Sequence, residues 1–142
     1  MRNRGAFTII ELIFVIVVLG ILAAVALPKF AGMREQADIA KGKGDVATIR
    51  AAIVNERQTR LIRGDASWIS AANLDTGGKL FGGVLMQGFS NSATSGNWSA
   101  TAGSGTYKYW VGSTDTTFDY NATTGSFGCT QVSGNYCDQL AN

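Results

Sequence analysis

The feature that most constrains this chain is an apolar segment near its start. Residues 12–27 contain no charged side chain, and the longer segment 9–27, nineteen residues, contains only Glu11. A helix rises about 1.5 Å per residue, so this segment covers about 28 Å, close to the thickness of the hydrocarbon core of a bilayer. Arg2 and Arg4 precede it, which predicts one membrane crossing with the N-terminus inside and the rest of the chain outside.

Glu11 is the residue of this segment that needs an explanation. A lone acid near the centre of a bilayer costs roughly 2.5–3.5 kcal/mol, less towards the interface, and such residues usually have a partner and a function. The sequence offers no cation within two helical turns after Glu11. A partner must therefore come from another chain, from interfacial water or from an N-terminal amine created by cleavage.

The same residues also allow an ordinary secretory signal peptide. The basic start, the apolar segment and the small residues Ala24 and Ala26 fit a peptide cleaved after Ala26. The mature chain would then be a secreted, soluble binding protein or enzyme. Glu11 and the apolar periodicity that continues beyond Ala26 count against this alternative, and the N-terminus of the mature chain distinguishes the two.

A helical repeat continues beyond Pro28 to about Arg63, where Gly64 and Asp65 offer a stop. One stripe follows spacings of three, four and seven residues, at Phe30, Met33, Ala37, Ala40, Gly44, Ala47, Ala51, Val54 and Leu61. Larger aliphatic residues widen this face, namely Ile39, Val46, Ile49 and Ile53. We therefore expect an amphipathic helix of about 35 residues that packs this stripe on its own head domain.

The composition changes after residue 65, where Gly, Ser, Thr and Asn dominate. Tyr107, Tyr109 and Val111 alternate with Lys108 and Trp110, which predicts a strand. Residues 117–127 predict a hairpin that turns at 121–125. Together these elements predict an α+β fold: a long N-terminal helix, with a membrane half and an amphipathic half, packed on a small antiparallel β-sheet head.

Composition and charge argue against two classes of function. Histidine is absent, so the usual general base and the commonest metal ligand are both missing. The net charge is +2, and residues 66–142 hold two basic and four acidic side chains, without the dense basic patch of a nucleic-acid binder. We therefore expect neither catalysis nor general nucleic-acid binding as the main activity.

Cys129 and Cys137 enclose seven residues near the C-terminus. In an exported chain such a pair predicts a disulfide, worth about 2.5 kcal/mol in the chain-entropy description of a nine-residue loop. Two unpaired thiols are the alternative, because spacing alone does not fix geometry.

Residues 5–11, Gly-Ala-Phe-Thr-Ile-Ile-Glu, resemble the processing site of type IV prepilins and type II secretion pseudopilins. In that family a short basic leader ends in a small residue, usually glycine, followed by phenylalanine, threonine, two aliphatic residues, glutamate and an apolar helix. The resemblance implies cleavage between Ala6 and Phe7 and N-methylation of Phe7. Alanine stands at position 6 where glycine is typical, so a cut after Gly5 is the alternative.

The resemblance runs from about residue 2 to residue 30 and includes Gly20 and Pro28, where the family often has helix-weakening residues. We expect the helix to loosen between these two residues on assembly. The implied organisation is a cleaved leader (1–6), a transmembrane and filament-core helix (7–28), an amphipathic helix half (29–64) and a β-rich head with a C-terminal disulfide loop (65–142).

The function implied by the resemblance is a structural subunit of a pilus-like filament, in particular a pseudopilin of a type II secretion or DNA-uptake system. A major type IV pilin for adhesion or motility is the alternative. The implied partners are sister subunits, minor pilins or pseudopilins, a prepilin peptidase, and an inner-membrane platform protein with its cytoplasmic ATPase; nucleic acid is a partner only in DNA uptake. The subunit would wait in the bacterial inner membrane with its head in the periplasm before it joins a filament.

Two further site expectations concern acidic residues. Glu11 is expected to act in assembly, by neutralising the amine of Phe7 within the chain or in a neighbouring subunit. Pseudopilin heads sometimes bind calcium, and the candidates here are Asp115, Asp119 and Asp138, which do not match an EF-hand loop. We expect these three to be solvated surface acids, and we expect no other cofactor.

Overall fold

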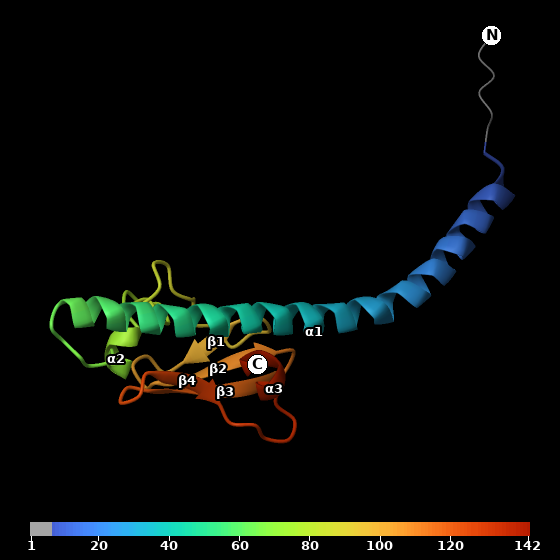
Figure 1. Ribbon diagram of the computed structural model, residues 1–142. Helices are drawn as coiled ribbons and strands as arrows, with labels where there is room; N and C mark the ends of the chain where they lie inside the picture. Colours follow the sequence, from blue (N-terminus) through green and yellow to red (C-terminus); the bar gives the residue numbers. More distant parts are fainter. Residues whose placement is uncertain (1–6) are drawn as a thin grey trace, which may run out of the picture. The chain divides into compact units, whose positions relative to one another are not determined.

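The computed structural model describes residues 7–142, apart from the side chains of residues 28, 29 and 31. The chain divides into two compact units, Met1–Arg34 and Glu35–Asn142. In chain order the elements are α1 (Ile9–Ile62), α2 (Ala71–Leu74), β1 (Trp98–Ala100), β2 (Thr106–Val111), β3 (Thr114–Asn121), β4 (Ser126–Cys129) and α3 (Cys137–Ala141). Figure 1 labels them.

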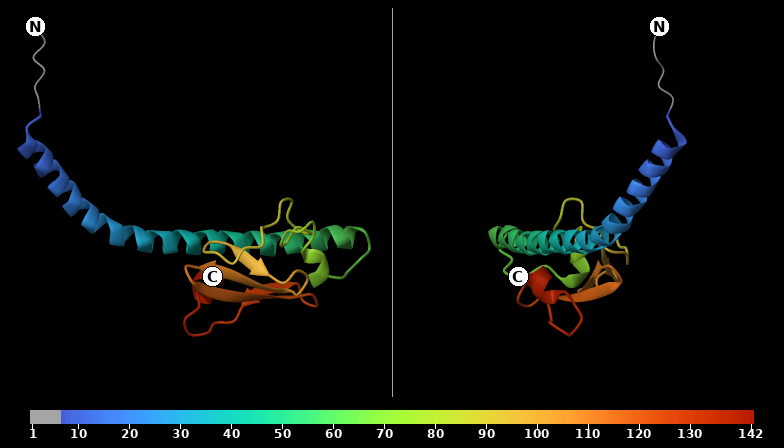
Figure 2. Two further views of the ribbon diagram at one scale, coloured as in Figure 1. Left: turned by 180° about the vertical axis from the view of Figure 1, so that it is seen from behind. Right: turned by 90° about the vertical axis from the view of Figure 1, so that its right-hand side faces the viewer.

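The four strands form an antiparallel sheet in the order β1-β2-β3-β4. The sheet lies along one side of the second half of α1, as the views in Figures 1 and 2 both show. The α+β fold expected from the sequence is therefore confirmed. Tyr107, Tyr109 and Phe118 point to the helix side and are fully buried, together with Trp98 from β1.

The predicted strand and hairpin are present, with earlier boundaries. β2 contains the alternating tyrosines, and β3 and β4 pair across the expected turn, with Asn121 opposite Ser126. β3 begins at Thr114, three residues earlier than predicted, because Gly112 adopts φ +61° in a tight turn that connects it to β2. β1 was not predicted, because three residues are too few to show an alternating pattern.

The face of α1 that packs on the head differs from the predicted stripe. The buried side chains are those of Ile39, Val46, Ile49 and Ile53, which are at most 8% exposed. The predicted stripe is exposed at every position that the second unit contains, from Ala37 to Leu61. The two sets are offset by two residues, about 200° around a helix, so they occupy opposite faces. The sequence prediction was wrong in assigning the stripe and these four aliphatic residues to a single face of the helix.

Gly42 lies on the buried face of α1 and sets how closely the head approaches. A Cβ at this position would lie 2.6 Å from Leu140 Cδ2 and 2.7 Å from Tyr109 Cζ, both closer than real Cβ atoms come to other atoms. Gly44, on the exposed face, has nothing within 4 Å of the same position. A glycine in a helix interior destabilises it by about 0.5–1 kcal/mol relative to alanine, and at Gly42 this is offset by the packing of Tyr109.

α1 ends one residue before the predicted position, in a Schellman arrangement. Gly64 has φ +86°, a conformation that favours glycine. Its N–H donates to Leu61 O at 3.0 Å, and the N–H of Asp65 donates to Arg60 O at 2.9 Å. These bonds satisfy two of the carbonyls left free at the helix end, so the Gly64-Asp65 stop signal is confirmed.

Both edges of the sheet are engaged by side chains or loops. At β1, the side-chain amide of Asn91 donates to Ala100 O at 2.7 Å and accepts from Ala100 N at 3.2 Å. The N–H of Ser92 donates to Trp98 O at 2.8 Å. At β4, Arg50 Nε of α1 donates to Phe127 O at 2.9 Å. Three groups that an open edge would offer to another strand at β1, and one at β4, are thus already used.

Candidate functional site

The start of α1 is organised by Thr8 and Glu11. Thr8 Oγ1 accepts a hydrogen bond from Glu11 N at 3.3 Å. In return, one carboxylate oxygen of Glu11 accepts from Thr8 N at 3.3 Å and from Thr8 Oγ1 at 3.2 Å. This reciprocal pattern is a capping box, in which the N-cap and the third helical residue satisfy each other's backbone donors. Glu11 therefore has a local partner at the edge of the apolar segment.

The first part of α1 exposes apolar side chains in every direction. Its large apolar residues from Ile9 to Leu27 are 37–79% exposed. Within residues 7–142, α1 is the one helix long and apolar enough to cross a membrane, and none of its most apolar window is buried. An isolated helix of this kind is not stable against water, so it requires a lipid or protein environment.

The residues expected to govern cleavage and flexibility lie around this segment. Gly5 and Ala6 lie outside the described residues, and Phe7 is 81% exposed. α1 continues as helix across Gly20 and Pro28. A Cβ at Gly20 would meet nothing within 4 Å. The expected loosening on assembly remains a prediction, because it concerns a different state of the subunit.

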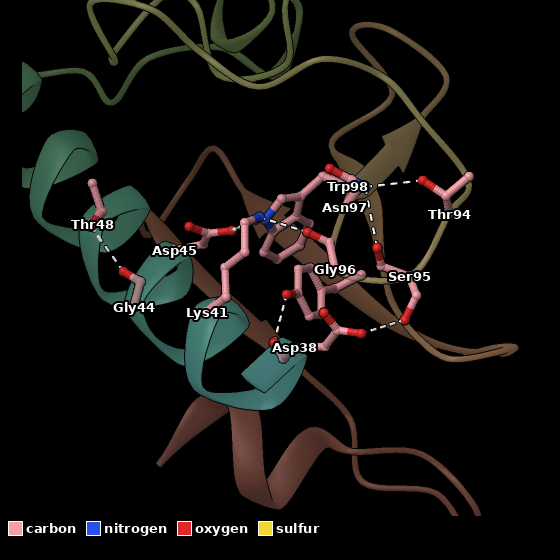
Figure 3. A network of polar contacts seen from close by, with 11 residues as sticks. Asp38, Lys41, Gly44, Asp45, Thr48, Thr94, Ser95, Gly96, Asn97 and Trp98 are labelled. Carbon is pink, nitrogen blue, oxygen red and sulfur yellow. Dashed lines mark hydrogen bonds and ion pairs between the residues drawn. The ribbon is translucent and has the colours of Figure 1, made fainter. Parts of the chain in front are cut away.

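A polar cluster fixes the loop before β1 to the second half of α1 (Figure 3). Lys41 Nζ lies 3.2 Å from Asp45 Oδ2 and donates to Gly96 O at 2.6 Å. Asp45 also accepts from Trp98 Nε1 at 3.1 Å, and Asp38 accepts from Ser95 Oγ. Because about two helical turns supply three charged side chains to this loop and to β1, the cluster fixes the position of β1 on the helix.

The C-terminal segment is held by a disulfide and two hydrogen bonds. Cys129 and Cys137 are bonded, with their Cα atoms 5.8 Å apart, which confirms the predicted pairing. Arg50 Nη1 donates to Ala141 O at 3.0 Å, and Tyr136 Oη donates to Glu35 Oε1 at 2.9 Å. Both contacts reach α1, so the disulfide loop and α3 are part of the packed head.

The three calcium candidates are not gathered into a site. Asp115 pairs with Lys108 at 3.0 Å, and Asp119 accepts from Thr106 Oγ1 at 2.8 Å. Among the described residues, no group of three or more acidic, cysteine or histidine side chains is placed to hold a metal ion. Asp138 is exposed at the start of α3, away from the β3 pair in sequence and contacts.

Sequence reasoning missed the role of Thr8 and of the cluster on α1. The pattern Thr-x-x-Glu before an apolar segment, present at residues 8–11, is a known signal for a helix start and would have identified the capping box. The partners of Lys41 and Asp45 outside α1, Gly96 and Trp98, lie more than 50 residues away. No pattern among neighbouring residues predicts such a contact.

The similarity of this chain to known proteins covers only part of its length. Residues 1–27 match the family described as the prokaryotic N-terminal methylation motif. Over 52 residues the chain is 42% identical to the type II secretion system core protein G of Pseudomonas aeruginosa. It is 46% identical over 52 residues to the type IV narrow pilus major component PilA5 of Thermus thermophilus, and 38% identical over 53 residues to core protein G of Vibrio cholerae.

These matches cover 37% of this chain, and 37%, 44% and 36% of the three relatives in the same order. The similarity therefore spans well under half the length of each relative. No solved structure matches the chain.

Proposed function

We propose, from the similarity of its N-terminal part to type IV pilins and type II secretion pseudopilins, that this chain belongs to their family and is a structural filament subunit that assembles through the first part of α1. The observation that carries the proposal is the apolar, fully exposed segment of α1, which begins in a capping box at Glu11. The family consists of structural subunits rather than enzymes, and the same role is proposed here.

Two surroundings suit a helix that is apolar on all sides: a bilayer, and a bundle of similar helices. A subunit that moves from one to the other keeps its apolar surface out of water throughout. We therefore place the subunit first in the bacterial inner membrane, with its N-terminus in the cytoplasm and its head in the periplasm, and then in a filament of identical copies.

Cleavage between Ala6 and Phe7 would give Glu11 a cationic partner in addition to Thr8. The cut leaves Thr8 N–H in an amide, so the capping box survives, and it creates a cationic amine on Phe7 next to Thr8. Two opposite charges 4 Å apart attract by about 4 kcal/mol at an effective dielectric constant of 20, and desolvation removes part of this gain. A subunit in the wrong axial register would leave one of the charges unpaired.

We favour a pseudopilin of a type II secretion or DNA-uptake system, and keep a major pilin of an adhesive or motility pilus as the second candidate. The first is supported by similarity to proteins named as secretion core protein G, the second by similarity to a protein named as a pilus major component. The proposed partners are a prepilin peptidase, an inner-membrane platform protein with its ATPase, and minor pilins or pseudopilins. Deleting the gene and scoring secretion, twitching and transformation separately distinguishes the candidates.

The test of the assembly role uses variants that separate charge from capping. Glu11→Leu removes both, Glu11→Gln keeps a capping side chain without the charge, and Thr8→Val removes the cap but keeps the charge. We expect all three to insert and to be cleaved to a chain that begins at Phe7. We expect the two Glu11 variants to remain in the membrane, while Thr8→Val still forms filaments.

Processing is followed by intact mass and N-terminal sequencing, and assembly by shearing and electron microscopy. Normal filament yield from Glu11→Gln would refute the role of the charge. Loss of filaments in Thr8→Val with normal cleavage would assign the role to the helix cap instead. A mature N-terminus at Leu27 would show a secreted protein and remove the filament proposal.

A further inference from the structure

We propose that the outer face of the head sheet carries a binding site for a neutral oligosaccharide. The site is a hollow of about 430 Å³ lined by Asn91, Ser99, Ala100, Thr101, Ser104, Thr106 and Lys108. Its volume falls in the range of small-molecule sites. The hollow lies over β1 and the start of β2.

The hollow lies on the side of the sheet opposite α1. Successive side chains of a strand point to opposite faces, and Tyr107 and Tyr109 are fully buried on the helix side. Thr106 and Lys108 therefore point outward, with Lys108 opposite Ser99 of β1. Since α1 contributes no residue to the hollow, this inference does not depend on the proposed filament.

The polar groups of the hollow are already oriented by their neighbours. Ser99 Oγ accepts a hydrogen bond from Trp110 Nε1 at 2.7 Å, which leaves its own proton to donate. Thr106 Oγ1 donates its proton to Asp119 at 2.8 Å, which leaves its lone pairs to accept. A sugar hydroxyl both donates and accepts, so this combination suits a ligand with several hydroxyl groups.

The charges around the hollow favour a neutral ligand over an anion. Lys108 is the one charged residue of the lining, and its ammonium is paired with Asp115 at 3.0 Å. Asp119 lies beside Thr106 on the same face. An anion would have to compete with two carboxylates for one lysine, whereas a neutral hydroxyl-rich ligand leaves these contacts intact.

A second, smaller hollow indicates a ligand of more than one ring. Its volume is about 110 Å³, and its lining includes Asn91, Ala102 and one charge of each sign, Asp75 and Lys79. Asn91 lines both hollows, and its amide is fixed by two hydrogen bonds to Ala100. The two therefore adjoin across a rigid wall, an arrangement that suits neighbouring units of an oligosaccharide.

The test uses the full chain in lipid nanodiscs, free of detergents with sugar headgroups. Maltotriose, cellotriose and N-acetylated chitotriose are added separately at about 20 mM, where a site of millimolar affinity is nearly saturated. We expect at least one to shift the backbone amide NMR signals of Ser99, Thr101 and Lys108. Absence of such shifts with all three would overturn the proposal, as would shifts with inorganic phosphate alone.

Variants then locate the binding. Thr106→Val removes one hydrogen bond and should weaken binding about fivefold. Thr101→Trp, at an exposed position, should fill the hollow and abolish binding. Thr117→Val is the matched control, because Thr117 lies opposite Lys108 on the outer face but does not line the hollow. Equal weakening by Thr117→Val, or unchanged binding by Thr101→Trp, would place the ligand elsewhere.

Discussion

Along the head, α1 presents two apolar faces that follow the same repeat but differ in residue size. One face carries Ile and Val side chains with a single glycine at position 42, and it is buried against the sheet and α3. The opposite face carries alanines and a single glycine, at position 44, as far as Ala51, followed by Val54 and Leu61, and it is exposed. Both faces recur every three or four residues, so periodicity alone does not distinguish them.

The difference lies in what each face can pack against. Branched aliphatic side chains project far enough to interlock with the aromatic residues of the sheet, where Ile49 and Ile53 are at most 1% exposed. Alanine and glycine form a shallow surface that contributes little to the core of the same chain. Residue volume therefore indicates which apolar face stabilises the head, and the following substitutions test this.

The largest effect is expected from Ile49→Ala on the buried face. Ile49 is fully buried, and truncating such a side chain to alanine destabilises a protein by about 2–5 kcal/mol. Val54→Ala on the exposed side should change stability by no more than about 0.5 kcal/mol. Urea unfolding of the full chain in micelles, followed by tryptophan fluorescence, measures both changes in stability. Equal effects would remove the distinction between the faces.

Removing the disulfide is expected to have the next largest effect. Cys137 begins α3, whose Leu140 packs beside Gly42 on the buried face. Replacing Cys129 and Cys137 with serine should destabilise the head by about 2.5 kcal/mol and speed proteolysis of the tail. Free-thiol labelling of both cysteines in the unreduced native protein would contradict the bond.

Alanine substitutions at the two glycines should change the stability of the head in opposite directions. Gly42→Ala should destabilise the head by about 1–3 kcal/mol, because the new methyl group overlaps Tyr109 and Leu140. Gly44→Ala should stabilise it by up to about 1 kcal/mol, because alanine is the better helix former and the position is open. Urea unfolding of the full chain in micelles measures both changes in stability. If Gly42→Ala stabilised the head, the buried face would be loosely packed.

The smallest expected effect on the stability of the head comes from tyrosine titration and appears only in alkaline solution. Burial, followed by the carboxylates of Asp45 and Asp38, raises the pKa of Tyr109 above its ordinary value of 10.0. The unfolded chain releases this proton near pH 10 while the folded head retains it. Stability is therefore complete below about pH 10 and falls as the pH rises further.

Burial, and then Asp75, also raises the pKa of Tyr107, so both tyrosines contribute to this loss. Tyr109→Phe should reduce the alkaline loss relative to the wild type, although it also removes the hydrogen bond from Tyr109 Oη to Asp38 O. Comparing the urea midpoint at about pH 8 and pH 11 for both chains isolates the effect. Identical midpoints at the two pH values in the wild type would show that these tyrosines do not titrate differently on unfolding.

The elements visible in the sequence were those with a long or strong local pattern. The apolar segment, the helix end at Gly64, the alternation of β2 and the cysteine pair each depend on neighbouring residues, and the structure contains all of them. The buried face of α1 could not be chosen by periodicity, because the two stripes repeat identically. β1 depends on pairing with β2 and on Asn91, a contact that a local pattern does not contain.

The features of the candidate site likewise separate into those that the sequence could predict and those that it could not. The Thr8 and Glu11 capping box was within reach of sequence reasoning, because both partners lie within four residues. The acids Asp115 and Asp119 were named as calcium candidates, but their partners Lys108 and Thr106 come from the neighbouring strand. Such pairing follows from the register of the sheet, which depends on the position of the turn at Gly112.

The engaged sheet edges have a consequence wherever many copies of the head lie close together. In the proposed membrane pool heads would collide often, and open strands would then pair into disordered aggregates that compete with the proposed assembly. Asn91 and Ser92 occupy the backbone groups of β1, and Arg50 occupies Phe127 O of β4. These strand groups are therefore not free to pair with the edge strand of a neighbouring head.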